Sequence, residues 1–137
     1  MTVLVDTRVW SLALRPGRQS TLAPVQELRY LISANRVQMI GPIRQEILSG
    51  IREDTQFKEL EARLAPFPDL PLTTEDHVTA ARFFNLCRQK GIQGSNTDFL
   101  ICAVAVRNRL AIFTDDKDFT SFTAHLPIIL YQTGRPE

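Results

Sequence analysis

The sequence predicts an α/β fold with three layers, in which a central parallel sheet of about four to five strands has helices on both faces. Two observations lead to this prediction. Short apolar runs alternate along the chain with segments whose apolar residues recur at helical spacing, which is typical of parallel strands joined by right-handed helical crossovers. The apolar runs also lack the polar alternation of a half-exposed strand, as expected of strands covered on both faces.

The first half of the chain supplies two strands of that sheet and three helices. The opening strand ends at Asp6, whose side chain can cap the helix that follows. Pro16 and Gly17 interrupt the chain before the second helix, and Gly41 and Pro42 turn the second strand into the third helix. The predicted elements are a strand at 2–5, helices at 7–14 and 22–35, a strand at 37–40 and a helix at 42–51.

The second half of the chain supplies three helices and the remaining strands. Prolines end the first helix, Gly91 ends the second, and Ser95 or Asn96 can cap the third. The third helix is apolar almost all round from 99 to 106, so it should lie under other elements. The second helix is expected to bury Val78, Ala81, Phe84 and Leu86 or Cys87. The predicted elements are helices at 54–64, 74–90 and 96–109, a short edge strand at 70–72, and strands at 111–114 and 128–131.

The composition is that of one ordinary globular domain. The 137 residues are 44% hydrophobic and 23% charged, so we expect a single domain over 1–137 with its own core. No apolar run has the pattern of a secretion signal or the length of a membrane span, which predicts a cytoplasmic protein. Cys87 and Cys102 have no metal-ligand or redox spacing and are expected to be reduced thiols, either in the core or half-buried.

Charge is segregated along the chain, although the formal net charge is only +1. Residues 1–52 carry seven basic and three acidic side chains and residues 82–111 carry five and one, whereas 53–81 and 112–137 are net negative. Thirteen of the sixteen cations are arginines, whose forked guanidinium suits phosphate. Solvated helix faces would explain the same pattern without a partner. If a nucleic acid binds, the candidate contacts are Arg8, Arg15, Arg18 and Arg44.

Four carboxylates are expected at one edge of the sheet. Asp6 and Asp116 follow strands closely, and Glu46 and Asp98 lie near the starts of helices that begin at that edge. Each acid taken singly can be explained as a helix cap or a solvated side chain. Together they would raise one another's pKa values by repulsion unless a cation holds them ionised. Oxygen ligands without a nearby His or Cys favour Mg²⁺ or Mn²⁺, and such a site supports phosphoryl transfer.

The acids stand in four segments that occur in a particular order. These are Val-Asp-Thr-Arg-Val-Trp at 5–10, Gln-Glu-Ile-Leu at 45–48, Thr-Asp-Phe-Leu-Ile-Cys-Ala at 97–103 and Phe-Thr-Asp-Asp-Lys-Asp-Phe at 113–119. The segments resemble the PIN domain and, more narrowly, the VapC-type ribonuclease toxins of toxin–antitoxin pairs, and the resemblance covers the whole chain. The catalytic and metal-binding acids that it implies are Asp6, Glu46, Asp98 and Asp116, with Asp118 as an auxiliary acid and Thr114 as the hydroxyl at the strand's end.

The resemblance implies a metal-dependent endoribonuclease that cuts RNA phosphodiester bonds with Mg²⁺ or Mn²⁺. It also implies a homodimeric toxin that is neutralised by a cognate antitoxin, whose tail lies in an apolar groove and pushes a basic side chain among the acids. The early helices are expected to supply the groove through Trp10, Leu12, Leu14, Leu22, Val25 and Leu28. Arg8 departs from the family pattern, because many relatives have Ser or Thr at this place.

The alternative hypothesis is a non-catalytic domain of the same fold, whose acidic pocket only docks a basic partner. Other phosphoryl-transfer folds fit less well. A haloacid-dehalogenase-like enzyme needs a second Asp where Arg8 stands. A receiver domain needs an acceptor Asp at the end of the third strand and a Lys after the fifth, and neither appears. No Gly-Lys-Ser/Thr phosphate loop is present either. His77 and His125 have no triad-like context and are expected to be ordinary side chains.

Overall fold

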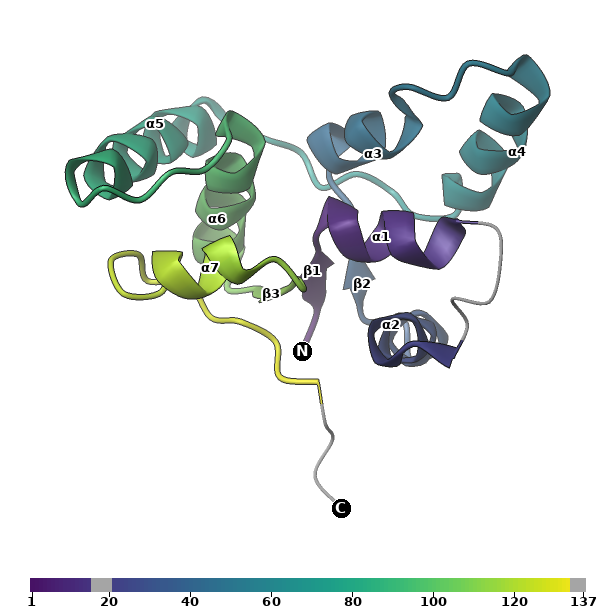
Figure 1. Cartoon of the computed structure of the whole chain (residues 1–137), viewed down its shortest axis with the longest axis horizontal. Coiled ribbons are helices and arrows are strands. Elements are labelled where there is room, and N and C mark those ends of the chain that lie inside the picture. Colours follow the sequence, from purple (N-terminus) through teal and green to yellow (C-terminus); the bar gives the residue numbers. More distant parts are fainter. Residues whose placement is uncertain (16–20, 134–137) are drawn as a thin grey trace.

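The computed structural model describes residues 1–15 and 21–133, and within them three parallel strands form the sheet (Figure 1). The strands are β1 (Val3–Val5), β2 (Val37–Gln38) and β3 (Ala111–Phe113), in the order β2-β1-β3. Val3 of β1 is opposite both Val37 and Ala111, so all three strands begin at the same level. The predicted parallel α/β fold is confirmed.

The sheet is smaller than the four to five strands predicted. The segments predicted as further strands, 70–72 and 128–131, lie next to it without extending it. Each segment, or the residue beside it, makes one isolated bridge among the described residues: Met39 with Asp69, and Ile112 with Leu130. Proline limits this pairing, because Pro71 and Pro127 have no N–H to donate to a neighbouring strand.

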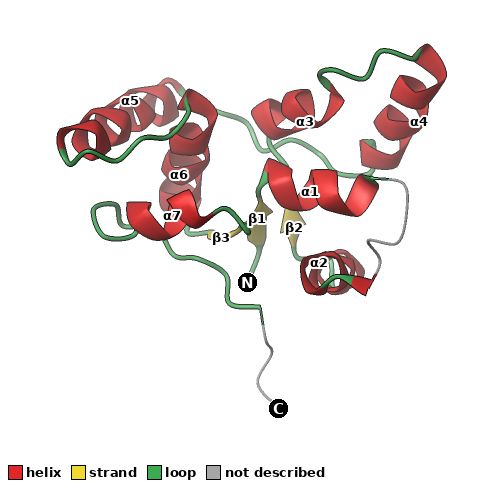
Figure 2. Cartoon of the chain, viewed as in Figure 1, coloured by secondary structure: helices red, strands yellow, loops and turns green. Residues whose placement is uncertain are grey.

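Helices account for most of the described chain (Figure 2). Those from α1 to α4 lie to one side of the strands and those from α5 to α7 to the other, in the right and left halves of Figure 1. Their bounds are α1 (Thr7–Leu14), α2 (Ala23–Ser33), α3 (Gly41–Leu48), α4 (Asp54–Leu64), α5 (Thr74–Gln89), α6 (Asn96–Asn108) and α7 (Lys117–Phe122).

The direction in which the chain crosses the sheet reverses at β1. The chain passes from β1 through α1 and α2 to β2 on one side, and then through the next four helices to β3, which pairs with the other side of β1. In sheets of this kind, the residues at the carboxyl ends of the strands form a crevice at the reversal point. Asp6 directly follows β1, and Thr114 directly follows β3. Both residues therefore lie at that crevice.

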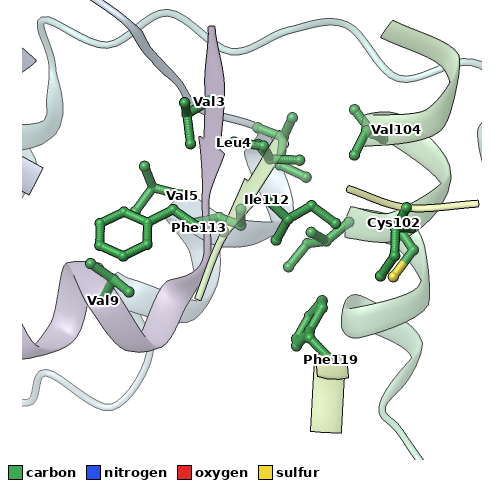
Figure 3. Packing of buried hydrophobic residues seen from close by; sticks show 14 of the residues in the cluster. Val3, Leu4, Val5, Val9, Cys102, Val104, Ile112, Phe113 and Phe119 are labelled. Carbon is green, nitrogen blue, oxygen red and sulfur yellow. The ribbon is translucent and has the colours of Figure 1, made fainter. Parts of the chain in front are cut away.

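The strands lie at the centre of the core (Figure 3). Every residue of β1 and β3 is buried, against side chains that include Val9 of α1 and Cys102 and Val104 of α6. Burial on both faces explains why these strands carry no alternating polar residues. Cys87 and Cys102 are both buried free thiols, as predicted. Within the described residues, no helix combines the length and the hydropathy needed to cross a membrane.

The buried face of α5 differs in part from the one predicted. Cys87 is buried and Phe84 is half-buried, as predicted, but Val78 is 47% exposed and Ala81 is exposed, whereas Asp76 and Ala80 are buried. The difference follows from an ion pair, because Arg107 donates to both carboxylate oxygens of Asp76, at 2.6 and 2.8 Å. This pair turns Asp76, and with it the positions four and eleven residues later, toward α6.

The predicted apolar groove on the early helices is largely absorbed into the core. Trp10, Val25 and Leu28 are at most 2% exposed and cannot form an open groove as they stand. Leu12 and Leu14 are half-buried, and Leu22 is 42% exposed. The remaining apolar surface on α1 and at the start of α2 is therefore smaller than expected.

Candidate active site

Asp6 is fixed between the ends of β1 and β3. It caps α1, with one carboxylate oxygen accepting from the Thr7 N–H at 2.8 Å and the other accepting from the Thr114 hydroxyl at 2.8 Å. Thr114 in turn accepts from the backbone N–H of Asp116 at 2.9 Å. Asp6 is 4% exposed, so these two donors hold a carboxylate that is almost removed from water.

Asp98 is positioned by the start of α6. It occupies the third position of a capping box, in which its side chain accepts from the Ser95 N–H and the Ser95 hydroxyl accepts from the Asp98 N–H, both at 3.0 Å. The capping contact to Ser95 uses Oδ2 of the carboxylate. Close packing restricts the segment that leads into α6, because a Cβ on Gly94 would stand 2.6 Å from the ring of Phe122.

Glu46 and Asp116 face the same crevice from α3 and α7. Glu46 accepts from the Thr7 hydroxyl at 2.6 Å, which links α3 to the residue after Asp6. Asp116 caps α7 and accepts from the backbone N–H of Asp118 at 2.9 Å. Asp118, predicted as an auxiliary acid, is exposed and acts here through its backbone.

The structure brings the four predicted acids together around one pocket of about 520 Å³. Their side chains come from four elements that are far apart in the sequence but meet at the carboxyl ends of the strands. The lining residues are Asp6, Thr7, Arg8, Pro42, Gln45, Glu46, Ser49, Thr97, Asp98 and Asp116. The geometry agrees with the predicted acidic site.

Burial and neighbouring carboxylates raise the pKa values of Asp6 and Asp98. Burial, with smaller contributions from the charges of Asp98 and Asp116, raises the pKa of Asp6 from 3.8 to about 6, against the hydrogen bonds from Thr114 and Thr7. Burial also raises the pKa of Asp98, with smaller contributions in the same direction from Asp116 and Glu46. The fold therefore holds negative charge at a cost that a bound cation would reduce.

The residues present fit a hard divalent cation. The acids supply oxygen ligands only, which suits Mg²⁺ or Mn²⁺. Within 1–15 and 21–133, however, no three Asp, Glu, His or Cys side chains stand close enough to hold an ion by themselves. An ion would therefore be held by one or two carboxylates together with its own water molecules, which is the usual mode of Mg²⁺ binding, and the pocket has room for them.

The four predicted RNA contacts have different surroundings. Arg8 lines the pocket and donates through Nε to Asp115 at 3.1 Å, while Arg15 is exposed at the end of α1 and Arg18 lies outside the described residues. Arg44 donates to Asp69 and to the carbonyl groups of Leu64 and Phe67. Contrary to the prediction, the Arg44 guanidinium is committed to the fold and braces α3 against the segment after α4.

The sequence patterns did not predict several residues that line the acidic pocket. Thr7 orients Glu46, and Thr97 stands beside Asp98 at the pocket edge. Gln45 and Ser49 are the neighbours of Glu46 on the exposed face of α3. Helical spacing around Glu46 would have indicated Ser49, which lies three residues later, whereas the pairing of Arg8 with Asp115 requires knowledge of the fold.

The raised pKa of Asp6 predicts that the metal-free protein loses stability as the pH rises through about 6. The folded state binds this proton more tightly than the unfolded state, so the stabilisation is complete below 3.8 and disappears above the folded pKa. We expect a loss on the order of 2 to 3 kcal/mol. Urea unfolding in EDTA at pH values on either side of 6 measures it, with Asp6→Asn as the control. Equal pH slopes for the two proteins would contradict the prediction.

Comparison with known proteins gives consistent matches. A family model described as the PIN domain matches residues 3–124. A VapC ribonuclease of Mycobacterium bovis, Mb1587, and ribonuclease VapC11 of Mycobacterium tuberculosis are each 35% identical over 121 residues, covering 85% of this chain and 88% of the relative. Among solved structures, FitAcB of Neisseria gonorrhoeae has a TM-score of 0.75 at 22% identity, covering 96% of this chain and 98% of that one. VapBC2 of Rickettsia felis, bound to a promoter DNA fragment, has a TM-score of 0.74 at 17% identity with the same coverage.

Proposed function

The chain belongs to the PIN domain family, and on this premise we propose that it is an endoribonuclease that cuts RNA phosphodiester bonds with the aid of Mg²⁺ or Mn²⁺. The curated relatives are named as ribonucleases, and they match over most of the chain. The acidic pocket supplies the chemistry that such an activity needs. We assign the catalytic role to the pocket's four carboxylates: Asp6, Glu46, Asp98 and Asp116.

One observation carries this proposal, namely the contrast between two buried acids. Asp76 and Asp6 are 1% and 4% exposed. Arg107 donates to Asp76 and holds its pKa below the usual value. Asp6 accepts from a hydroxyl and an amide, has no ion-pair partner within the described residues, and has two further acids near it that raise its pKa. The fold thus neutralises one buried acid and leaves the other to a cation from outside.

The pocket residues have distinct tasks in this proposal. When bound, the metal ion activates water and neutralises charge on the scissile phosphate. The buried Asp6 and the half-buried Asp98 would hold the ion, and the hydrogen bonds from Thr114 and Ser95 orient them. Glu46 and Asp116 stand on other walls of the pocket and would hold the water molecules of the ion. Thr7 keeps Glu46 in place through its hydroxyl.

The proposal is tested by incubating the purified protein with single-stranded RNA in Mg²⁺, in Mn²⁺ and in EDTA. Cleavage is expected with either metal and none is expected in EDTA. If the protein binds Mn²⁺ but cuts no RNA under any condition, the alternative of a binding domain with an acidic docking pocket would replace it.

We also propose that the protein is the toxin of a VapBC-type pair, is cytoplasmic and forms a homodimer. Support for the toxin of such a pair comes from the relatives named VapC ribonuclease and from the solved structure named VapBC2. A cognate antitoxin would place a basic side chain in the acidic pocket, where it would replace the charge of the cation. A monomeric sedimentation profile at micromolar concentration would contradict the homodimer.

Arg8 is proposed to hold a phosphate of the RNA next to the pocket. Its side chain is 61% exposed and stands in the first turn of α1, where the helix dipole disfavours a cation. Asp115 binds its Nε. Because Nη1 and Nη2 form the other side of the guanidinium fork, a phosphate can approach from the pocket.

Replacing Arg8 by Ala is expected to raise KM and to lower the slope of log KM against log salt by about 1, because one phosphate contact is lost. Asp115→Asn should have the opposite effect on KM, since it removes a competitor for the guanidinium. Arg29→Ala, which removes an exposed cation of α2 outside the pocket, is the matched control. Equal KM values and salt slopes for Arg8→Ala and Arg29→Ala would contradict this role.

A further inference from the structure

A second pocket of about 400 Å³ lies between α5 and the first turns of α6. It is lined by His77, Ala80, Ala81, Phe84, Asn85, Asn96, Thr97 and Leu100. Thr97 lines this pocket as well as the acidic one, and Asp98 is the next residue along the chain. The two pockets are therefore neighbours across a single residue.

The lining combines an apolar floor with a polar rim. Ala80 is buried and Phe84 and Leu100 are half-buried, so they form the floor. His77, Asn85 and Asn96 are exposed and carry the hydrogen-bonding groups of the rim. In contrast to the acidic pocket, the lining of this one contains no Asp, Glu, Lys or Arg. The pocket thus suits an uncharged group with flat apolar faces and polar edges.

The aromatic ring of the floor, Phe84, is held in place from two sides. The ring of Phe84 meets Phe99 edge to face, with 5.6 Å between the ring centroids, and the guanidinium of Arg88 stands over the Phe84 ring at 4.7 Å. Such contacts keep the ring from turning freely. A ligand would therefore meet an aromatic surface that is already in place.

We propose that this pocket receives one unstacked base of the RNA that is bound in the acidic pocket, an inference that rests on the proposed nuclease function. Proteins read single-stranded RNA by taking splayed bases against apolar or aromatic side chains and hydrogen-bonding their edges, for which Asn amides are well suited. Because Thr97 borders both pockets, the base belongs to a nucleotide at or next to the scissile bond. The pocket then selects the sequence that is cut.

A second copy of the chain fits this pocket less well. The large apolar side chains exposed on α5 are Val78 and Leu86, and neither lines the pocket. The exposed residues that α5 contributes to it are His77, Ala81 and Asn85, one of them small and two polar. Cores of protein interfaces are instead built around large apolar and aromatic side chains.

The test combines a protein variant whose pocket is filled with RNA substrates that lack one base. Ala81→Phe places a ring in the pocket, and Ala62→Phe, at an exposed position of α4, is the matched control. Each protein is assayed in Mg²⁺ on single-stranded RNAs in which every position around the cleavage site is replaced in turn by each base and by an abasic nucleotide. For the wild type and Ala62→Phe, one abasic position is expected to raise KM about 10-fold or more. For Ala81→Phe, the ratio of KM on the abasic RNA to KM on the intact RNA should fall to near one.

The outcomes separate the base pocket from the nuclease function. If the wild type cleaves RNA and Ala81→Phe shows the same ratio of KM on abasic RNA to KM on intact RNA, the base pocket alone would be overturned. A change of molar mass in Ala81→Phe, with base preference kept, would assign the pocket to a second copy instead. If the wild type neither cuts nor binds single-stranded RNA, both proposals fail together.

Discussion

The Asp98→Asn variant is expected to lose RNA cleavage by at least about 100-fold while keeping its fold, since replacing even a supporting residue of a metal site costs about 10- to 100-fold. The substitution removes the charge that Asp98 offers to a cation. It keeps the helix start, because the amide oxygen of Asn can still accept the hydrogen bond from the Ser95 N–H. It also removes repulsion with Asp116 and Glu46, both of which raise the pKa of Asp98.

Two measurements separate this prediction from a folding defect. Single-turnover cleavage in Mg²⁺ gives the loss of activity, and thermal unfolding in EDTA should give a melting temperature equal to or above that of the wild type. Glu59→Gln, which neutralises an exposed acid of α4 outside the pocket, is the matched control and should leave both values unchanged. Wild-type cleavage by Asp98→Asn, or by the wild type in excess EDTA, would rule out the metal site.

The acids were predictable because their positions depend on local sequence signals. Asp6 follows an unbroken apolar run and caps the next helix, and Asp98 lies three residues after the Ser that caps α6. Both patterns fix a side chain relative to its own element. The α/β pattern then places the ends of β1 and β3 at the same edge, which is enough to predict that these acids meet.

Other features depend on contacts between distant segments, and the sequence did not reveal them. The face that α5 buries is set by Asp76 and its partner in α6, against the apolar pattern around Val78. In the sequence Arg44 resembles a free cation, but in the fold the segment after α4 places Asp69 beside it. The sheet was overestimated because apolar residues near Pro71 and Pro127 predict strands, although proline cannot continue the pairing.

The contact between Arg107 and Asp76 is expected to stabilise the packing of α5 on α6. Asp76 is 1% exposed and receives both donors of the guanidinium fork, while Arg107 also donates to the Pro71 carbonyl at 3.2 Å. Arg107→Ala would leave a buried carboxylate unpaired. We expect this to lower the free energy of unfolding, measured by urea denaturation at neutral pH, by more than the loss of an exposed cation does, although Asp76 keeps the hydrogen bond from the Thr73 N–H.

The pH dependence identifies the cause of that loss. Pairing lowers the pKa of Asp76 in the folded state, so the contribution is present above the unfolded value of 3.8 and is lost as the pH falls through the folded pKa. The gap between the wild type and Arg107→Ala should therefore narrow in acid. Adding Asp76→Asn to Arg107→Ala should recover part of the loss, because an amide keeps the cap on α5 without a buried charge. Arg82→Ala, at an exposed position of α5, should change stability by less than about 0.5 kcal/mol. If Arg107→Ala costs no more than Arg82→Ala, or if its cost does not change with pH, the ion pair is not what sets the packing of α5 on α6.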